Sequence, residues 1–444
     1  MDVPTAQPRV ALAAHIRSAG AHGLVAALWV VIIGITPLTI IDDAFISFRY
    51  ARNLATHGEL VFNPGERVEG ITNLLWTLLL SAINAVTSAP LPETAVVLAL
   101  LLLLFTALRM IQLAEALGSP ALLGPLAGGA LLLDHDVMLA ATNGLEGALF
   151  MALLAEGVLR YARGQLVLAF FCMGLLFLTR PEGIACGALL LLVAASDRRR
   201  LRSMLAGLAV FGAIIAGATI FRVMFYGSAV PNSVIAKSTD FQTIRTIWPF
   251  YRKAVSAYSR SFIGANPLFL ALLAAMPVIL WLNRRRGDGA RGVVVFCLGA
   301  TLGSWLIMAR NGGDWMPNYR LLTQYTPLYL VPLLALPNTR VHDLLGLADA
   351  YLARHGTFRP TFGRDDPNYT LSVVHPTILI WHYVGHVFGA QPDLLAQYTA
   401  FCAADCASWD ADVVMVRNDR LAAFGPAFAD WQRVRFTERQ VVPE

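Results

Sequence analysis

The stretch ITPLTIIDDAFISFRYARNLATHG, residues 35–58, joins an apolar run to two adjacent aspartates and then to a polar segment. The apolar run has the composition of a membrane-spanning helix, so Asp42 and Asp43 stand where that helix would leave the bilayer. A charged side chain at mid-bilayer costs roughly 2.5–3.5 kcal/mol on insertion scales. The pair is therefore expected to face water or a polar cavity at the membrane edge.

The composition around this stretch extends the membrane interpretation to the whole chain. Of the 444 residues, 57% are hydrophobic and 14% are charged, whereas a soluble protein carries about 25% charged residues. Repeated long apolar runs predict an all-α polytopic membrane protein. The net charge of +5 comes from short arginine clusters between these runs. Such clusters are typical of cytoplasmic loops and indicate no nucleic-acid partner.

The arginine clusters also predict the topology. The candidate spans are 24–41, 71–88, 94–115, 121–141, 147–161, 165–179, 183–196, 204–225, 263–282, 292–308 and 321–337. Two candidate spans separate each basic cluster (160–163, 197–202 and 283–291) from the next, so all three can share the cytoplasmic side with the N-terminus. Five candidate spans precede residue 160, and an odd number of crossings would put the cluster at 160–163 on the outer side. One of these five candidates must therefore not cross the membrane. We interpret 71–88, which is the most polar, as a helix along the interface, with an ordinary span as the alternative.

This topology places the unusual polar strings on one face of the membrane. The outward segments are 42–93, 142–147, 180–183, 226–262 and 309–320. The inward loops hold little besides arginine. Convergence of polar residues from five separate parts of the chain predicts a site on the outer face.

Acidic residues in these strings are candidate catalytic groups. Asp42 and Asp43 could cap the helix that follows them, or one of them could act as a general base towards a hydroxyl. Like charge at close range would raise one pKa and favour that role. Glu146, between Gly144 and Gly147, could hydrogen-bond a sugar hydroxyl, with helix capping as the alternative.

Basic residues in the same strings are candidates for binding a phosphate, because arginine forks match phosphate oxygens. Each has a structural alternative: Arg49 and Arg52 could extend to lipid headgroups, Arg180 could pair with Glu182, and Lys237 could be solvated. The full set of phosphate candidates is Arg49, Arg52, Arg180, Lys237 and Arg320.

A sugar or an acceptor would need polar and aromatic partners. Asp314 and Trp315, in NGGDWMPNYR, are similar to a carbohydrate-contacting pair, although Trp315 could equally belong to the interfacial aromatic belt. Asn143 and His57 complete this candidate set. No metal ligands are assigned and no cofactor is expected, with a divalent metal left open.

The strings DDAFISFRYARNLATHGELVFNPGERVEGITNLLW, TNGLEGALF, RPEG, YGSAVPNSVIAKS and GGDWMPNYR occur in this order over residues 24–337. Together they resemble the GT-C superfamily of integral-membrane glycosyltransferases, in particular the terminal β-(1→2)-arabinofuranosyltransferases and their bacterial relatives. Each string alone is weakly specific, but the ordered set is specific.

The resemblance implies a GT-C fold with about ten transmembrane helices and juxtamembrane helices in the first outer loop. It implies a polyprenyl-phosphate sugar donor, possessing a good leaving group, and an acceptor that is a glycan, lipid or protein of the cell envelope. Transfer would occur at the outer face of the bacterial inner membrane, with inversion. Asp42 and Asp43 match the acidic motif of the first outer loop, and Glu146 matches the second acidic position.

The chain divides into a cytoplasmic segment, 1–23, a transmembrane catalytic domain, 24–337, and a C-terminal soluble region, 338–444. Strand-like runs at 377–384 and 412–417 predict a small α/β fold for the last region. Family members generally have further spans before this region, so either 321–337 does not cross or this chain has lost spans and could be impaired.

Two other classes of function stay open at this point. A polytopic transporter or flippase for an anionic or lipid-linked substrate would also gather carboxylates and arginines. It would place them near the midplane within inverted repeats, and the sequence shows no such repeat. The other alternative is a non-catalytic, lipid-binding relative.

Overall fold

The computed structural model describes residues 8–36, 40–195, 200–232, 234, 248–266, 269, 276, 279, 288–311, 319–335, 370–373 and 432–435. The helices are α1 (Pro8–Ile35), α2 (Asp42–His57), α3 (Leu74–Thr87), α4 (Leu91–Ala116), α5 (Leu123–Leu133), α6 (His135–Thr142), α7 (Gly147–Ala162), α8 (Leu166–Thr179), α9 (Gly183–Ala194), α10 (Leu201–Tyr226), α13 (Trp248–Ala265), α15 (Asp288–Arg310), α16 (Arg320–Thr323) and α17 (Thr326–Leu334). Two strands, β1 (Thr370–Val373) and β2 (Gln432–Arg435), pair antiparallel, with Thr370 opposite Arg435.

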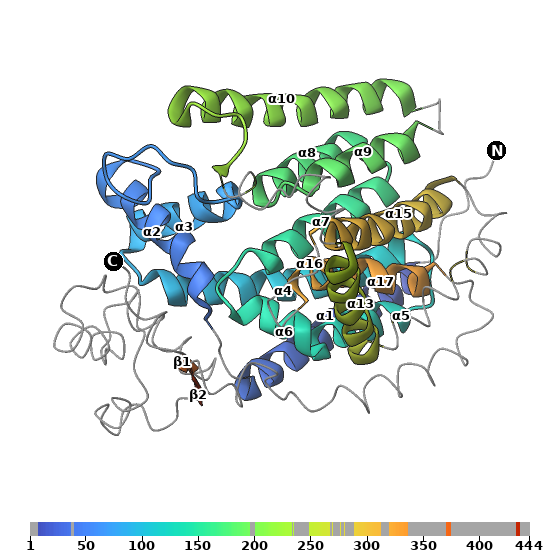
Figure 1. Cartoon of the computed structure of the whole chain (residues 1–444). Coiled ribbons are helices and arrows are strands. Elements are labelled where there is room, and N and C mark those ends of the chain that lie inside the picture. The colour runs from blue at the N-terminus through green and yellow to red at the C-terminus, as the bar shows by residue number, and fades with distance from the viewer. Residues whose placement is uncertain are drawn as a thin grey trace.

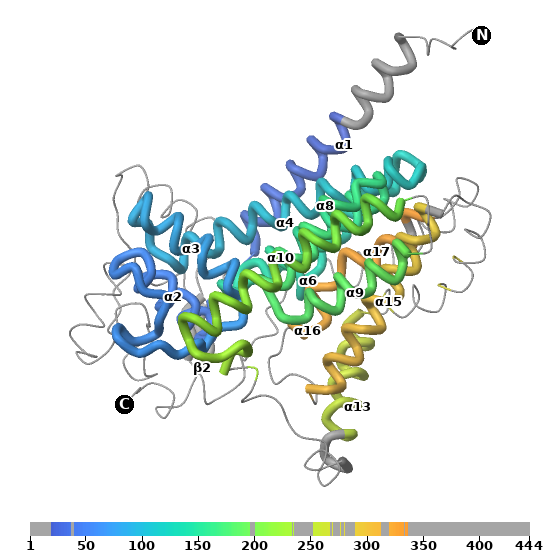
Figure 2. Tube along the Cα trace, turned by 90° about the horizontal axis from the view of Figure 1, so that it is seen from above, coloured from blue at the N-terminus to red at the C-terminus, as the bar shows by residue number. Residues whose placement is uncertain are grey.

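The helices form a bundle in which α4, α7 and α8 are central (Figure 1). Helix α7 packs against both α4 and α8, α5 packs on α4, and α10 lies along α8. Helices α2 and α3 pack on each other at one end of the bundle (Figure 2). This end, where α2 and α3 meet the turns between longer helices, carries the polar residues described below.

Small residues allow α5 to approach α4 closely. A Cβ atom on Gly124 would lie 2.9 Å from the Cα of Ile111, and one on Gly128 would lie 2.8 Å from the carbonyl oxygen of Ala107. Two glycines four positions apart lie on the same face of a helix. Such small-residue faces are a common way for helices to associate in lipid, where the hydrophobic effect does not drive helix pairing.

Three helical segments in the described part of the chain are long and apolar enough to cross a membrane: Leu91–Ala116, Leu201–Tyr226 and Gly289–Arg310. A fourth would be α6 together with α7, which are bent by 115° at their junction. The 26 residues of α10 span about 39 Å at 1.5 Å per residue, which exceeds a hydrocarbon core of about 30 Å. The membrane character of the chain is therefore supported, whereas ten crossings stay a prediction.

The candidate span 121–141 is not one continuous helix, because this segment forms two helices. Helix α5 ends at Leu133, and Asp134 caps the start of α6 by accepting a hydrogen bond of 2.9 Å from the backbone N–H of Val137. Aspartate is a favoured N-cap because its carboxylate satisfies an N–H that has no partner within the helix. The cap explains why an apolar segment of spanning length divides here.

Helices at the two ends of the first outer segment agree with the sequence. The stretch after the aspartates is helical, as expected. Segment 71–88 contains α3, a helix of 14 residues, or about 21 Å. Its position along the interface stays a prediction. The strand-like runs at 377–384 and 412–417 lie outside the described residues, and the boundary at residue 338 stays a prediction.

Candidate active site

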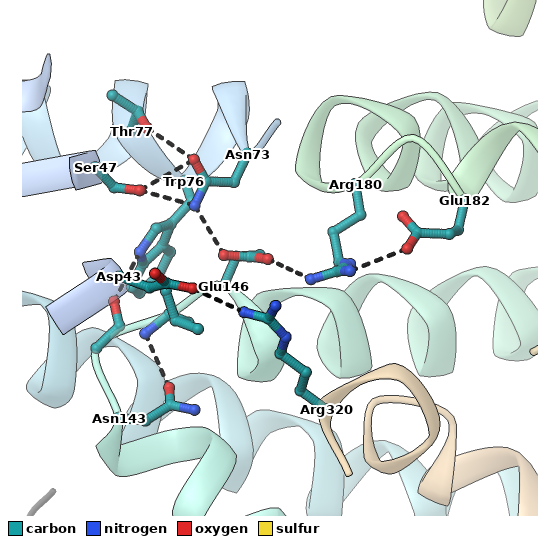
Figure 3. A network of polar contacts seen from close by, with 12 residues as sticks. Asp43, Ser47, Asn73, Trp76, Thr77, Asn143, Glu146, Arg180, Glu182 and Arg320 are labelled. Atoms are coloured by element: carbon teal, nitrogen blue, oxygen red, sulfur yellow. Dashed lines mark hydrogen bonds and ion pairs between the residues drawn. The ribbon is translucent and has the colours of Figure 1, made fainter. Parts of the chain in front are cut away.

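The two aspartates at the start of α2 have different partners. Asp42 accepts the backbone N–H of Asp43 on its Oδ1, at 2.9 Å, so it satisfies a donor of the first helical turn. The Oδ2 of Asp43 instead lies 3.1 Å from the Nη1 of Arg320, which begins α16 and is 277 positions away in the chain. Ile41 is the N-cap residue of α2 and no side chain makes a capping bond there, so the bond of Asp42 is a local contact within the first turn. Asp43 instead belongs to a long-range ion pair (Figure 3).

The pKa of Asp42 is raised above its ordinary value of 3.8. Surrounding protein atoms displace water from this carboxylate, which is the larger cause, and the negative charge of Asp43 is the second. The charge of Arg320 acts in the opposite direction. The like-charge effect expected from the sequence is present, but desolvation contributes more to the pKa shift than Asp43 does.

Glu146 is buried and uses both carboxylate oxygens. Its Oε1 lies 2.7 Å from the Nη1 of Arg180, and its Oε2 accepts a hydrogen bond of 2.8 Å from the Nδ2 of Asn73. Glu146 is the N-cap residue of α7, but its side chain makes no capping bond. The capping alternative does not apply, and Glu146 instead joins α3 to the turn between α8 and α9.

Arg180 bridges two carboxylates. It contacts Glu146 through Nη1 and the Oε1 of Glu182 through Nη2, at 2.9 Å. The arginine has an extended backbone, with φ −155° and ψ 140°, as expected for a residue before proline, and Pro181 thereby ends α8. Pairing with Glu182, the alternative left open by the sequence, is correct, but it is only half of the arrangement.

The positive charge of Arg180 favours the ionised form of the Glu182 carboxyl group. Burial alone would raise the pKa of Glu182, yet the charge and hydrogen bond of Arg180 outweigh it, and the pKa of Glu182 is lowered. Conversely, the two carboxylates raise the pKa of Arg180 despite burial, so the arginine is fixed as a cation. This part of the site therefore holds one permanent positive charge between two acids.

Asn73, the N-cap residue of α3, was not among the site residues predicted from the sequence. Besides bonding Glu146, its Nδ2 lies 2.9 Å from the Oγ of Ser47, and its Oδ1 accepts a hydrogen bond of 3.2 Å from the Oγ1 of Thr77. The only signal in the sequence is a neutral amide at the start of an apolar helix. A neutral residue of this kind can be assigned to a site only when its hydrogen-bond partner in the folded protein is known.

The turn over residues 143–146 brings Glu146 against α2. Gly144 has φ +82°, and a Cβ there would lie 2.9 Å from that of Ala44 on α2. The carbonyl of Gly144 accepts a hydrogen bond of 3.1 Å from the indole N–H of Trp76, and the carbonyl of Asn143 accepts one of 3.2 Å from the N–H of Ile41. Asn143 thus shapes the turn, with its Oδ1 accepting the N–H of Leu145 at 2.9 Å.

Several predicted site residues lie elsewhere. The guanidinium of Arg49 bonds the carbonyl of Phe62 at 2.9 Å and the Oδ1 of Asn63 at 3.1 Å, so it holds the following loop. Arg52 lies about one turn further along α2, and His57 ends that helix, where its ring contacts Thr56. Fourteen residues of helix separate His57 from Asp43 by about 20 Å. The proposed phosphate role of Arg49 and the sugar role of His57 are therefore not supported by these positions.

Three other candidates, Lys237, Asp314 and Trp315, lie outside the described residues. Within the described part of the chain, no group of three or more His, Cys, Asp or Glu side chains could hold a metal ion. The described site thus combines the carboxylates of Asp42, Asp43, Glu146 and Glu182 with the guanidinium groups of Arg180 and Arg320.

A second buried ion pair, also missed by sequence analysis, supports the loop that precedes Asn73. The Nε of Arg222 on α10 lies 2.9 Å and 3.2 Å from the two carboxylate oxygens of Glu69. The hydroxyl of Tyr50 on α2 donates to the carbonyl of Val68 at 2.6 Å and accepts the N–H of Gly70 at 2.8 Å. This loop is therefore fastened to two helices.

Such an arrangement can perform acid–base chemistry beside a phosphate. A carboxylate held by an arginine can take a proton from a hydroxyl, since Asp43 keeps 31% of its side chain exposed and remains open to a substrate. Arginine side chains at the same place can neutralise an anionic leaving group.

Comparisons with known proteins identify relatives in sequence and in fold. No family model matches the chain. The chain is 30% identical over 344 residues to a terminal β-(1→2)-arabinofuranosyltransferase of Mycobacterium tuberculosis, covering 66% of this chain and 53% of that protein. It is also 30% identical over 365 residues to the protein of the same name in Corynebacterium glutamicum, covering 68% of this chain and 49% of that protein. The chain thus spans about half the length of the curated relatives it matches.

The fold has a counterpart among solved structures. The crystal structure of the Archaeoglobus fulgidus oligosaccharyltransferase in the apo form matches 89% of this chain and 59% of that chain, with a TM-score of 0.51. The sequence identity is 11%, so this likeness concerns the fold. In sequence and in fold, the chain therefore resembles the GT-C superfamily of integral-membrane glycosyltransferases, and its curated relatives are terminal β-(1→2)-arabinofuranosyltransferases.

Proposed function

We propose that the protein is an inverting glycosyltransferase that uses a polyprenyl-phosphate sugar as donor. The acceptor is a glycan, lipid or protein of the cell envelope, and transfer occurs at the outer face of the bacterial inner membrane. The name of the curated relatives supports arabinofuranose as the sugar.

One observation carries this proposal: acidic and basic side chains from distant parts of the chain meet at one end of the bundle. Asp43 from α2 meets Arg320 from α16, and Glu146 before α7 meets Arg180 after α8 (Figure 3). Buried and half-buried charges are costly unless they are paired or used. Gathering them beside long apolar helices suits a substrate that has a lipid tail and a phosphate.

In the proposed reaction, Asp43 is the general base. Its carboxylate takes the proton of an acceptor hydroxyl while that oxygen forms a bond to the anomeric carbon of the sugar. The bond between the anomeric carbon and the phosphate oxygen breaks, and the lipid phosphate leaves with the electron pair. A single displacement with base and leaving group on opposite faces inverts the anomeric centre.

Arg180 and Arg320 are the proposed partners of the phosphate. A phosphate monoester is a good leaving group, so stabilising its charge suffices and no strong general acid is needed. Glu146, which the sequence suggested as a catalytic group, has both oxygens occupied. Its proposed role is therefore to hold Arg180, not to contact the sugar as a base.

The test is incubation of the purified protein with a panel of radiolabelled decaprenyl-phosphate sugars and envelope acceptors. Asp43→Asn should reduce transfer by about 100- to 10,000-fold, the usual contribution of a general base, without unfolding the protein. Asp42→Asn is the matched control. Its rate of sugar transfer should fall much less, because the Oδ1 of asparagine can still accept a hydrogen bond from the N–H of residue 43.

The outcomes separate the alternatives. Transfer at the wild-type rate by Asp43→Asn would remove the general-base assignment. Absence of transfer by the wild type with every donor, together with retained binding of decaprenyl phosphate, would favour a non-catalytic lipid-binding protein.

A further inference from the structure

Asn73 occupies the centre of the polar network without being charged. Its side chain contacts three helical regions: Ser47 on α2, Thr77 on α3 and Glu146 before α7. It is 6% exposed. An amide buried to this extent has its hydrogen bonds specified by its neighbours, since leaving a donor or an acceptor unsatisfied is costly.

The bond from Asn73 to Glu146 determines which oxygen of Glu146 remains for Arg180. Asn73 takes Oε2, and Arg180 takes Oε1. Arg180 also pairs with Glu182, so the position of its guanidinium group depends on both carboxylates. If Glu146 rotated, Arg180 would follow it or shift towards Glu182.

Asn73 is itself held firmly on both sides in the sequence. Before it, the Glu69–Arg222 ion pair and the N–H of Gly70 on the Tyr50 hydroxyl fix the loop. After it, Trp76 of the same helix donates to the carbonyl of Gly144. The start of α3 therefore contacts the turn at 143–146 through two hydrogen bonds, one from Asn73 to Glu146 and one from Trp76 to Gly144. These contacts oppose a movement of Asn73 together with Glu146.

We propose that Asn73 is a positioning residue that, through Glu146, orients Arg180 towards the phosphate of the donor. This inference rests on the proposed function. It assigns no contact between Asn73 and the substrate. The expected consequence is that the donor binds more weakly when the amide N–H no longer points at Glu146.

The test exchanges the donor and the acceptor of this hydrogen bond. In Asn73→Asp an oxygen replaces Nδ2 and faces the Oε2 of Glu146, whereas in Glu146→Gln two amide groups face each other. The double variant Asn73→Asp/Glu146→Gln restores a donor–acceptor pair, and the remaining oxygen of the glutamine can still accept from Arg180. Net charge is the same in the double variant and the wild type.

Each single variant should raise the donor KM about 10- to 100-fold, the range expected for a hydrogen bond to a charged group, with a smaller change in kcat. The double variant should recover about tenfold of this loss. Asn84→Asp is the matched control, because Asn84 lies on the same helix and its Nδ2 bonds the carbonyl of Ala89 at 2.8 Å. The control should keep the wild-type KM.

A structural role for Asn73 predicts a different pattern: Tm falls in Asn73→Asp, while the KM per folded molecule is unchanged. That pattern, or a double variant no better than the worse single variant, overturns the proposal. If the wild type shows no transfer at all, the proposed function fails separately. The dissociation constant of decaprenyl phosphate then replaces KM: weakening in Asn73→Asp with recovery in the double variant supports the positioning role, and equal constants overturn it.

Discussion

At the scale of single residues, Asp42 and Asp43 are neighbouring aspartates whose carboxylates have different partners. Successive residues of a helix point about 100° apart, so only one of the two can face α16. Asp43 faces Arg320 and remains partly open to a substrate. Asp42 accepts an N–H of the first turn, and its ionisation is disfavoured by its surroundings.

The raised pKa of Asp42 predicts a pH-dependent cost in stability. The folded protein binds this proton more tightly than the unfolded chain, in which the group titrates near 3.8, so folding loses free energy as pH rises through the raised pKa. Asp42→Asn removes the ionisation and should stabilise the protein at pH 7, by no more than about 1 kcal/mol because the residue is exposed. The gain should fade as pH falls towards 3.8.

The measurement is the Tm of detergent-solubilised wild type and Asp42→Asn at several pH values between 7.5 and 4. Glu66→Gln, which changes another exposed carboxylate, is the control. A difference in Tm between Asp42→Asn and the wild type that stays constant with pH would contradict the assigned pKa shift.

The charged members of the site could be predicted from the sequence, and the neutral members could not. Asp43, Glu146 and Arg320 are charges at the ends of apolar runs, and such charges require a special explanation. Asn73 carries no charge, and in the sequence it served only to mark 71–88 as a polar candidate span. The burial of Asn73 is what makes its amide important, and burial depends on how α2, α3 and the 143–146 turn pack.

At the scale of elements, the 143–146 turn determines the geometry of the site. It separates α6 from α7 with a bend of 115° and places Glu146 against α2 and α3. The turn depends on Gly144, which combines a left-handed backbone with a tight contact to Ala44 and Phe48.

Gly144→Ala should therefore destabilise the protein and displace α2 from the turn. The added Cβ would meet the Ala44 Cβ at 2.9 Å, and overpacking of this kind costs about 1–3 kcal/mol beyond the backbone strain of about 1–2 kcal/mol. Gly65→Ala is the matched control, because Gly65 has φ +84° and its Cβ would meet open space.

Denaturation curves of the two variants in detergent isolate the packing contribution as the difference between them. Gly144→Ala should also lose transfer activity, since Glu146 lies two residues further on. Equal stability of the two variants would show that α2 does not press on the turn.

The division of 121–141 into α5 and α6 illustrates why element boundaries are hard to predict here. The segment is apolar throughout except near Asp134, His135 and Asp136, and hydropathy does not distinguish a long helix from two short ones. The aspartate cap at residue 134 decides between them. In the first outer segment, by contrast, charged residues and Gly58 delimit α2 clearly, and the prediction was confirmed.

At the scale of the whole molecule, the arrangement of arginines predicts which end of the bundle faces the cytoplasm. Arg160 lies near the C-terminal end of α7, and Glu146 precedes its N-terminal end. The cytoplasmic cluster and the candidate site are thus expected at opposite ends of the same helix. By the positive-inside rule, we predict that the candidate site lies on the outer side of the membrane.

Cysteine labelling of intact cells tests this orientation. In a background that lacks the native cysteines, Glu66→Cys, in the exposed loop after α2, should react with a membrane-impermeant maleimide from outside. Ser203→Cys, an exposed position near the start of α10, should react only after the cells are permeabilised. The reverse pattern would put the site on the cytoplasmic side.

The fold class could be predicted from composition and the ordered motifs, and the likeness to the archaeal oligosaccharyltransferase agrees with it. The number of membrane crossings could not be predicted from the sequence. Short apolar helices such as α5, α8 and α9 have the same hydropathy whether or not they span a bilayer. Only their packing and their depth in the lipid distinguish these cases.

The ion pair between Asp43 and Arg320 has a consequence for biosynthesis. Its two members are 277 positions apart, so a ribosome translating at about 5–20 residues per second needs roughly 14–55 s to make the second after the first. During that interval the nascent chain already exposes its amino-terminal acids without their cation. The candidate site is therefore complete only after α16 has been made, and a chain interrupted before α16 would lack this ion pair.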